Sequence, residues 1–174
     1  MDRMWSPWRS EYVAEAADRT PPPSDTASIF TQLLEEDNDP ENLILWRGEQ
    51  VFVIMNLYPY NNGHLLIVPY REVDTYRVLT AAEQTAIATT IGRCIGWLEA
   101  TLSPEGVNVG MNLGAAAGAG IPEHMHVHVV PRWTGDTNFM STTAETRVLP
   151  EDLSTTYDKL RAVIDDDASS SASR

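Results

Sequence analysis

The sequence is poor in three kinds of feature, and each scarcity excludes a class of protein. Cys94 is its one cysteine, so no disulfide can form within the chain. Lys159 is its one lysine, and with eleven arginines against 25 acidic residues the formal net charge is -13. The longest apolar runs, such as residues 65–68, are far too short to span a bilayer. These absences argue against a disulfide scaffold, a membrane partner and a nucleic-acid partner, whose backbone needs clustered cations.

The chain of 174 residues, 43% of them hydrophobic, is long enough for one domain with a substantial core. Residues 1–27 carry Trp5, Trp8 and a proline run, which predicts an ordered N-terminal arm and an extended linker. Residues 28–164 form the predicted domain, and the acidic, serine-rich residues 165–174 predict a disordered tail. Because the N-terminus shows no basic-then-apolar targeting pattern, we expect a cytoplasmic location. The acidic, lysine-poor composition is also typical of adaptation to high salt.

Hydrophobic periodicity predicts an α+β fold. Short apolar runs bounded by turn residues predict strands over 43–46, 51–56, 64–69, 107–113 and 125–130. Thr80 and Glu83 form a capping-box pattern ahead of apolar positions at helical spacing, which predicts a long helix ending near residue 102. A short helix over 29–34 and a C-terminal helix over 153–164 complete the pattern. Short loops between strands favour antiparallel pairing, so we expect a meander sheet with the long helix and the C-terminal helix on one face.

Histidine is used four times in the whole chain, and three of these residues alternate with apolar ones over residues 124–128. In a strand, side chains two residues apart share a face, so the three imidazoles line one face and the apolar residues the other. The fourth, His64, opens another strand-like run. With an unperturbed pKa of about 6.5, most of these rings are neutral near pH 7. Neutral imidazoles in a row serve either as nucleophiles or as zinc ligands.

The run 124–130 resembles the histidine-triad (HIT) signature, His-φ-His-φ-His-φ-φ, in which φ is apolar. Residues 52–56, 63–69, 108–114 and 117–121 resemble further blocks of that superfamily. Residues 4–9 and 131–139 look like its bacterial branch, which is related to diadenosine tetraphosphate phosphorylases and hydrolases. The likeness runs from about residue 4 to about residue 164. It implies a five-stranded antiparallel sheet, pairing into a homodimer or larger homo-oligomer, and cleavage of a nucleotide at its α-phosphate through a nucleotidyl-histidine intermediate.

The resemblance also assigns roles to the histidines. It makes His126 the nucleophile, with His124 and His128 as orienting and phosphate-contacting neighbours. His64 would support the three from a neighbouring strand. Adjacent rings discourage each other's protonation, which keeps the attacking imidazole neutral. The acceptor of the nucleotidyl group stays open between water and phosphate, because both reactions share the covalent step.

Further residues are expected to hold the nucleotide. The resemblance places a ribose-binding residue at Asn56, and an amide suits a sugar hydroxyl because it both donates and accepts. Small residues near the phosphates let backbone N–H groups approach an anion closely, whereas apolar side chains would wall the base. The residues expected in these phosphate and base contacts are Asn112, Gly118, Ala119, Gly120, Ile29 and Phe30.

Two departures from the family pattern affect the expected chemistry. Ser28 and Thr31 stand where many bacterial members carry the Cys-x-x-Cys of a structural zinc site, so we expect no zinc there. Gly120 stands near the position where eukaryotic branches carry Gln or Ser to assist the leaving group. The covalent mechanism requires no cofactor. Two alternatives remain open at this point, a non-catalytic nucleotide-binding protein and a histidine-rich metal-binding protein.

Overall fold

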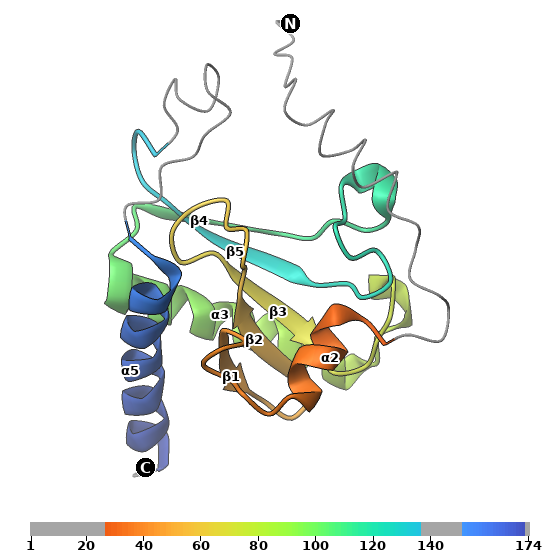
Figure 1. Ribbon diagram of the computed structural model, residues 1–174, viewed down its shortest axis with the longest axis horizontal. Coiled ribbons are helices and arrows are strands. Elements are labelled where there is room, and N and C mark those ends of the chain that lie inside the picture. The colour runs from red at the N-terminus through yellow and green to blue at the C-terminus, as the bar shows by residue number, and fades with distance from the viewer. Residues whose placement is uncertain (1–26, 137–150, 173–174) are drawn as a thin grey trace, which may run out of the picture. The chain divides into compact units, whose positions relative to one another are not determined.

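The computed structural model describes residues 27–136 and 151–172 (Figure 1). The predicted N-terminal arm, up to residue 26, lies outside the described residues, as do residues 137–150 and 173–174. No helix in the described part of the chain is long and apolar enough to cross a membrane.

Five strands form one antiparallel sheet, as predicted. They are β1 (Ile44–Arg47), β2 (Val51–Met55), β3 (Leu65–Pro69), β4 (Gly106–Gly110) and β5 (Val127–Arg132). The strand order is β1-β2-β3-β5-β4, so the sheet is not a simple meander. The chain leaves β3, passes through a long helix to the sheet edge as β4, and returns as β5 between β3 and β4. This order places the strand that carries His128 next to the strand that follows His64.

Three α-helices accompany the sheet: α2 (Ile29–Glu35), α3 (Ala81–Leu102) and α5 (Leu153–Ala172). Two short 3-10 turns, η1 (Tyr76–Val78) and η2 (Ala115–Ala117), lie in the connections. The predicted capping box at the start of α3 is confirmed. The hydroxyl of Thr80 accepts from the Glu83 N–H at 3.2 Å, and the Glu83 carboxylate accepts from the Thr80 N–H at 2.7 Å.

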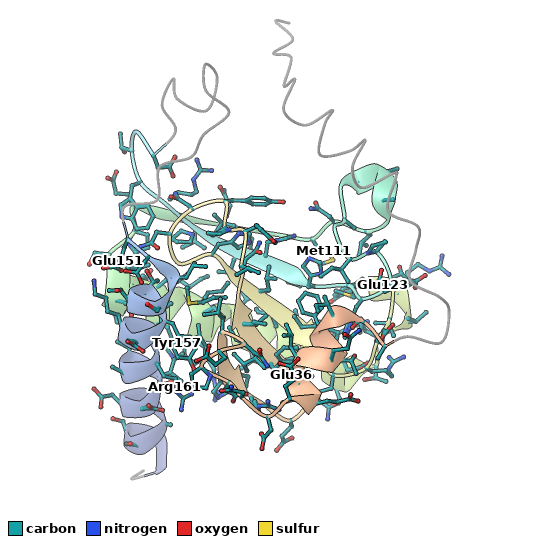
Figure 2. All side chains as sticks on the ribbon, in the orientation of Figure 1. Glu36, Met111, Glu123, Glu151, Tyr157 and Arg161 are labelled. Carbon is teal, nitrogen blue, oxygen red and sulfur yellow. The ribbon has the colours of Figure 1, made fainter. Side chains whose placement is uncertain are left out.

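The long helices α3 and α5 share one face of the sheet, where they bury alternate strand residues in the larger core. Figure 2 shows Tyr157 and Arg161 of α5 directed toward β1, where they donate to the carbonyls of Ile44 and Leu45. The short helix α2 covers the opposite face, where Phe30 packs with the other alternate strand residues (Figure 1). The expectation that the long helix and the C-terminal helix share one face of the sheet is therefore confirmed, and α2 lies on the other face.

The C-terminal helix is longer than predicted. It continues to Ala172, so residues 165–172 are helical, which corrects the prediction of a disordered tail from residue 165. Two side-chain contacts explain the extension. Asp165 pairs with Arg161 one turn earlier at 2.7 Å, and Asp167 accepts from the indole N–H of Trp97 on α3 at 3.3 Å. Asp165 and Asp167 thus tie the end of the helix to Arg161 and Trp97, although residues 165–170 remain exposed.

Candidate active site

The alternation of histidines with apolar residues places the two sets on opposite faces, as predicted, although β5 begins at Val127 and both His124 and His126 precede it. Met125, Val127 and Val129 lie in the core beneath α3, each about 1% exposed or less. His124 and His126 lie on the face covered by α2, where the Phe30 ring forms an edge-to-face pair with each imidazole at centroid distances of 5.5 and 5.3 Å. We call His124, His126 and His128 the histidine row.

The imidazole of His124 is held at both ring nitrogens. Its Nε2 lies 2.8 Å from the carbonyl oxygen of Pro69, which can only accept, so Nε2 carries the proton. Its Nδ1 therefore accepts, and its partner is the hydroxyl of Ser28 at 2.6 Å. Burial lowers the pKa of this fully buried ring below its usual 6.5, which keeps it neutral.

The same reasoning fixes the proton of His126. Its Nδ1 lies 3.0 Å from the carbonyl oxygen of His124 and must donate to it. In the neutral ring the lone pair is then on Nε2, which has no hydrogen-bond partner among the residues that the structure describes. Burial lowers the pKa of His126, which is only 5% exposed. The middle histidine is therefore a neutral ring with an available lone pair, as a nucleophile requires.

His64 and His128 form a second hydrogen-bonded pair. The Nδ1 of His64 receives the backbone N–H of Tyr60 at 3.0 Å and the amide of Asn56 at 3.2 Å, so it is an acceptor. The amide is oriented by its own oxygen, which accepts from the backbone N–H of Tyr58. The proton of His64 is consequently on Nε2, which donates to Nδ1 of His128 at 3.0 Å.

This pairing leaves His128 with a proton on Nε2. That atom is buried and has no hydrogen-bond partner within residues 27–136 and 151–172. Burial, together with the neighbouring His126 ring, lowers the pKa of His128 to about 4. The rings of His126 and His128 lie edge to face, with centroids 4.9 Å apart. One ring thus offers a lone pair and the next an unsatisfied N–H donor, side by side.

A glycine turn delivers His64 to this position. Gly63 has a φ of +76°, a conformation that favours glycine over any other residue. A Cβ at this position would lie 2.4 Å from a methyl carbon of Leu102 on α3. Loop 57–62 is also tied to the end of β5, because Asn61 donates to the carbonyl of Pro131 and to the carboxylate of Asp136.

The structure brings some predicted nucleotide contacts to the histidines but not others. Asn56 and Phe30 touch the histidine cluster, where Asn56 orients His64 and the buried Phe30 supports the row. Ile29 is 45% exposed beside them on α2. Asn112 donates to the carbonyl of Gly118 at 3.4 Å and so closes its own loop. No hydrogen bond in the described residues joins Asn112, Gly118, Ala119 or Gly120 to a histidine ring.

The Ser28 and Thr31 positions form a hydrogen-bonded cluster with Glu72 and His124. The carboxylate of Glu72 accepts from the backbone N–H of Ser28 at 2.9 Å and from the Thr31 hydroxyl at 3.4 Å. This donor set of two hydroxyls, one exposed carboxylate and one imidazole does not suit zinc, which prefers thiolate and imidazole ligands. In the described part of the chain, no group of three or more histidine, cysteine or acidic side chains is arranged to hold a metal ion.

Sequence reasoning did not predict the contacts of three residues at this site. Tyr60 packs against the rings of His64, to which it is tilted, and His128, on which it stacks, at centroid distances of 4.8 and 5.7 Å. Ser28 bonds to the His124 ring, and Glu72, from a different segment, bonds to Ser28. Ser28 stands where a helix N-cap is expected, ahead of the predicted helix, but nothing local signals its partner 96 residues away.

Comparison with known proteins gives consistent matches. The HIT domain matches residues 38–135. An AP-4-A phosphorylase from Mycobacterium tuberculosis is 41% identical over 153 residues, which cover 87% of this chain and 78% of that protein. A bis(5'-nucleosyl)-tetraphosphatase [asymmetrical] from Schizosaccharomyces pombe is 34% identical over 96 residues, 51% of this chain and 52% of that protein. Among solved structures, a Zn-bound histidine triad family protein from Mycobacterium smegmatis superposes with a TM-score of 0.67 at 22% identity, covering 83% of this chain and 97% of that one.

Proposed function

Because the chain belongs to the HIT domain family, we propose that it is an enzyme that cleaves a diadenosine polyphosphate at the α-phosphate, with diadenosine tetraphosphate as the substrate to test first. The observation that carries the proposal is which ring nitrogen of each histidine carries a proton. His126 presents an Nε2 lone pair, and the adjacent His128 presents an unsatisfied Nε2–H. A phosphoryl group needs these two partners, a nucleophile for phosphorus and a donor for oxygen.

In the first step, Nε2 of His126 forms a bond to the α-phosphorus. The bond from that phosphorus to the bridging oxygen breaks, and its electron pair leaves with the departing nucleotide, which is ATP when the substrate is diadenosine tetraphosphate. The ring of His126 becomes positively charged, and its Nδ1–H donates a charge-assisted hydrogen bond to the carbonyl of His124, 3.0 Å away before reaction. His128 Nε2–H would donate to a phosphate oxygen as negative charge develops there.

In the second step, an acceptor oxygen attacks the phosphorus and the bond to His126 breaks. Phosphate as acceptor releases ADP, whereas water releases AMP. We favour phosphate, because the relative that matches most of this chain at 41% identity is described as an AP-4-A phosphorylase. The other site residues are proposed to act as predicted. Asn56 contacts the ribose, the loop from Asn112 to Gly120 contacts the phosphates, and Ile29 contacts the base beside Phe30.

The test is product analysis with diadenosine tetraphosphate, with and without phosphate. We expect ADP and ATP in equal amounts, dependent on phosphate. Formation of AMP and ATP regardless of phosphate would make the enzyme a hydrolase. The variant His126→Asn should bind nucleotide without turnover. When phosphate is left out, the wild type should accumulate an acid-labile adenylyl group on the peptide containing His126. Nucleotide binding with no turnover by the wild type would refute catalysis in favour of a binding protein.

We also propose that the enzyme needs no structural zinc and that it forms a dimer. The first proposal is supported by the unsuitable donor set at Ser28, Thr31 and Glu72. The second is supported by β4, which lies at a sheet edge. Val109 in this strand and Met111 just after it are exposed apolar side chains. Stoichiometric zinc in the purified protein, lost together with thermal stability on chelation, would contradict the first proposal.

A further inference from the structure

The first turn of α2 reaches across the sheet face to the histidine row. Ser28 is the N-cap of this helix and is 1% exposed. Its hydroxyl accepts from the backbone N–H of Thr31 at 3.3 Å and lies 2.6 Å from Nδ1 of His124. Its backbone N–H donates to Glu72 at 2.9 Å. One buried residue therefore joins the helix start and the histidine row through its hydroxyl, and the segment after β3 through its backbone N–H.

The direction of the contact between Ser28 and His124 follows from its surroundings. Nε2 of His124 is committed as a donor to the carbonyl of Pro69, so Nδ1 of the neutral ring has only a lone pair. The Ser28 hydroxyl must therefore donate its proton to Nδ1. With a donor on one nitrogen and an acceptor on the other, the ring of His124 cannot turn over without breaking both bonds.

The position of His124 in turn decides the position of the nucleophile. Nδ1–H of His126 donates to the main-chain carbonyl of His124, and this bond is what leaves the lone pair on Nε2 of His126. Phe30, two residues after Ser28, forms an edge-to-face ring pair with both imidazoles. The first turn of α2 thus contacts the ring of His124 through Ser28 and the reacting ring of His126 through Phe30.

We propose that Ser28 positions the nucleophile His126 by acting through His124. The Ser28 hydroxyl holds the His124 ring by a hydrogen bond, at a place where the family pattern has a metal-binding cysteine. This inference rests on the proposed function for its kinetic consequence but not for its structural one. Ser28 touches neither substrate nor the reacting nitrogen. Its effect is to fix which nitrogen of His124 donates and, through the carbonyl of that residue, where the ring of His126 sits.

The test is Ser28→Gly in the full chain. Glycine is an acceptable N-cap that costs only a few tenths of a kcal/mol relative to serine, so helix α2 keeps its start while the hydroxyl is lost. The matched control is Thr31→Val, which removes a hydroxyl from the same cluster and leaves the hydroxyl of Ser28 in contact with His124. Both variants are compared with the wild type by ring-nitrogen NMR of 15N-labelled histidine and by steady-state kinetics.

We expect Ser28→Gly to move the Nδ1 resonance of His124 toward the position of a nitrogen without a hydrogen bond. We expect the Nδ1–H of His126 to exchange faster with solvent and kcat to fall roughly tenfold at a KM within about twofold of the wild type. Thr31→Val should change none of these. An unchanged His124 resonance and an unchanged kcat in Ser28→Gly would overturn the inference. Should the wild type prove inactive, the proposed function fails, and the NMR comparison alone decides whether Ser28 orients His124.

Discussion

Acidification should destabilise the folded chain through His128, and the size of the effect follows from its environment. Burial and the adjacent His126 ring lower the pKa of His128 to about 4, whereas in the unfolded chain the value is about 6.5. Between these two values the unfolded chain binds a proton that the folded chain does not, so stability rises with pH. The contribution of this group is complete above pH 6.5 and is lost as the pH falls toward 4. From pH 7 to pH 5 the loss is about 2 kcal/mol.

Other groups must be separated from this effect. The carboxyl of Glu83, which bonds to Arg71, has a pKa of about 2, so its stabilisation is present above about pH 4.5 and does not change between pH 5 and pH 7. His124 and His126 also have lowered pKa values and contribute in the same direction as His128. A variant of His128 alone is therefore needed to isolate its share.

The experiment compares wild type with His128→Asn by urea unfolding at pH 5, 6 and 7 at constant ionic strength. The asparagine oxygen can still accept the Nε2–H of His64, so the pair retains a hydrogen bond. The wild type should lose about 2 kcal/mol more than the variant between pH 7 and pH 5, which corresponds to about one proton. Equal pH dependence of the two proteins would show that His128 is not held neutral by its surroundings and would refute the assignment of protons to the ring nitrogens.

Four further outcomes are expected. Glu83→Gln should lower the free energy of unfolding by about 1–2 kcal/mol in urea, because it weakens both the α3 cap and the pair with Arg71. Asp167→Ala removes the acceptor of the Trp97 indole, so the amides of residues 165–172 should exchange faster in hydrogen–deuterium exchange with little change in global stability. The urea midpoint should rise from low to molar salt, since a net charge of -13 is screened; an unchanged midpoint contradicts adaptation to salt. Light scattering should give about twice the chain mass of 19.3 kDa, whereas a monomer would contradict pairing.

Local signals in the sequence predicted most of the elements, because each signal acts within a few residues. The capping box of Thr80 and Glu83 marks where α3 starts, and the two-residue alternation around His126 separates a core face from a reactive face. The order of the strands was not predictable in this way. The insertion of β5 between β3 and β4 depends on the path of the chain through α3, which no short window of sequence contains.

The candidate site was likewise predictable only where the signal is local in sequence. The histidines were visible because their spacing is regular and the residue type is rare in this chain. The protons on their nitrogens were not, because each is fixed by a partner distant in sequence or by a backbone group. Ser28 meets His124 across 96 residues, and His64 meets His128 across 64. The helical end of α5 was mispredicted for a similar reason, since composition favours disorder and the contact between Asp167 and Trp97 joins residues 70 apart.

The loop between β2 and β3 has a chemical role as well as a connecting one. Its backbone, at Tyr60, donates to the same nitrogen of His64 that Asn56 also occupies. Lengthening or shortening this loop would therefore change more than its outline: it would remove the backbone donor and allow the hydrogen to move to the other side of the ring. A change in the number of residues in this loop would therefore alter which nitrogen of His64 carries the proton.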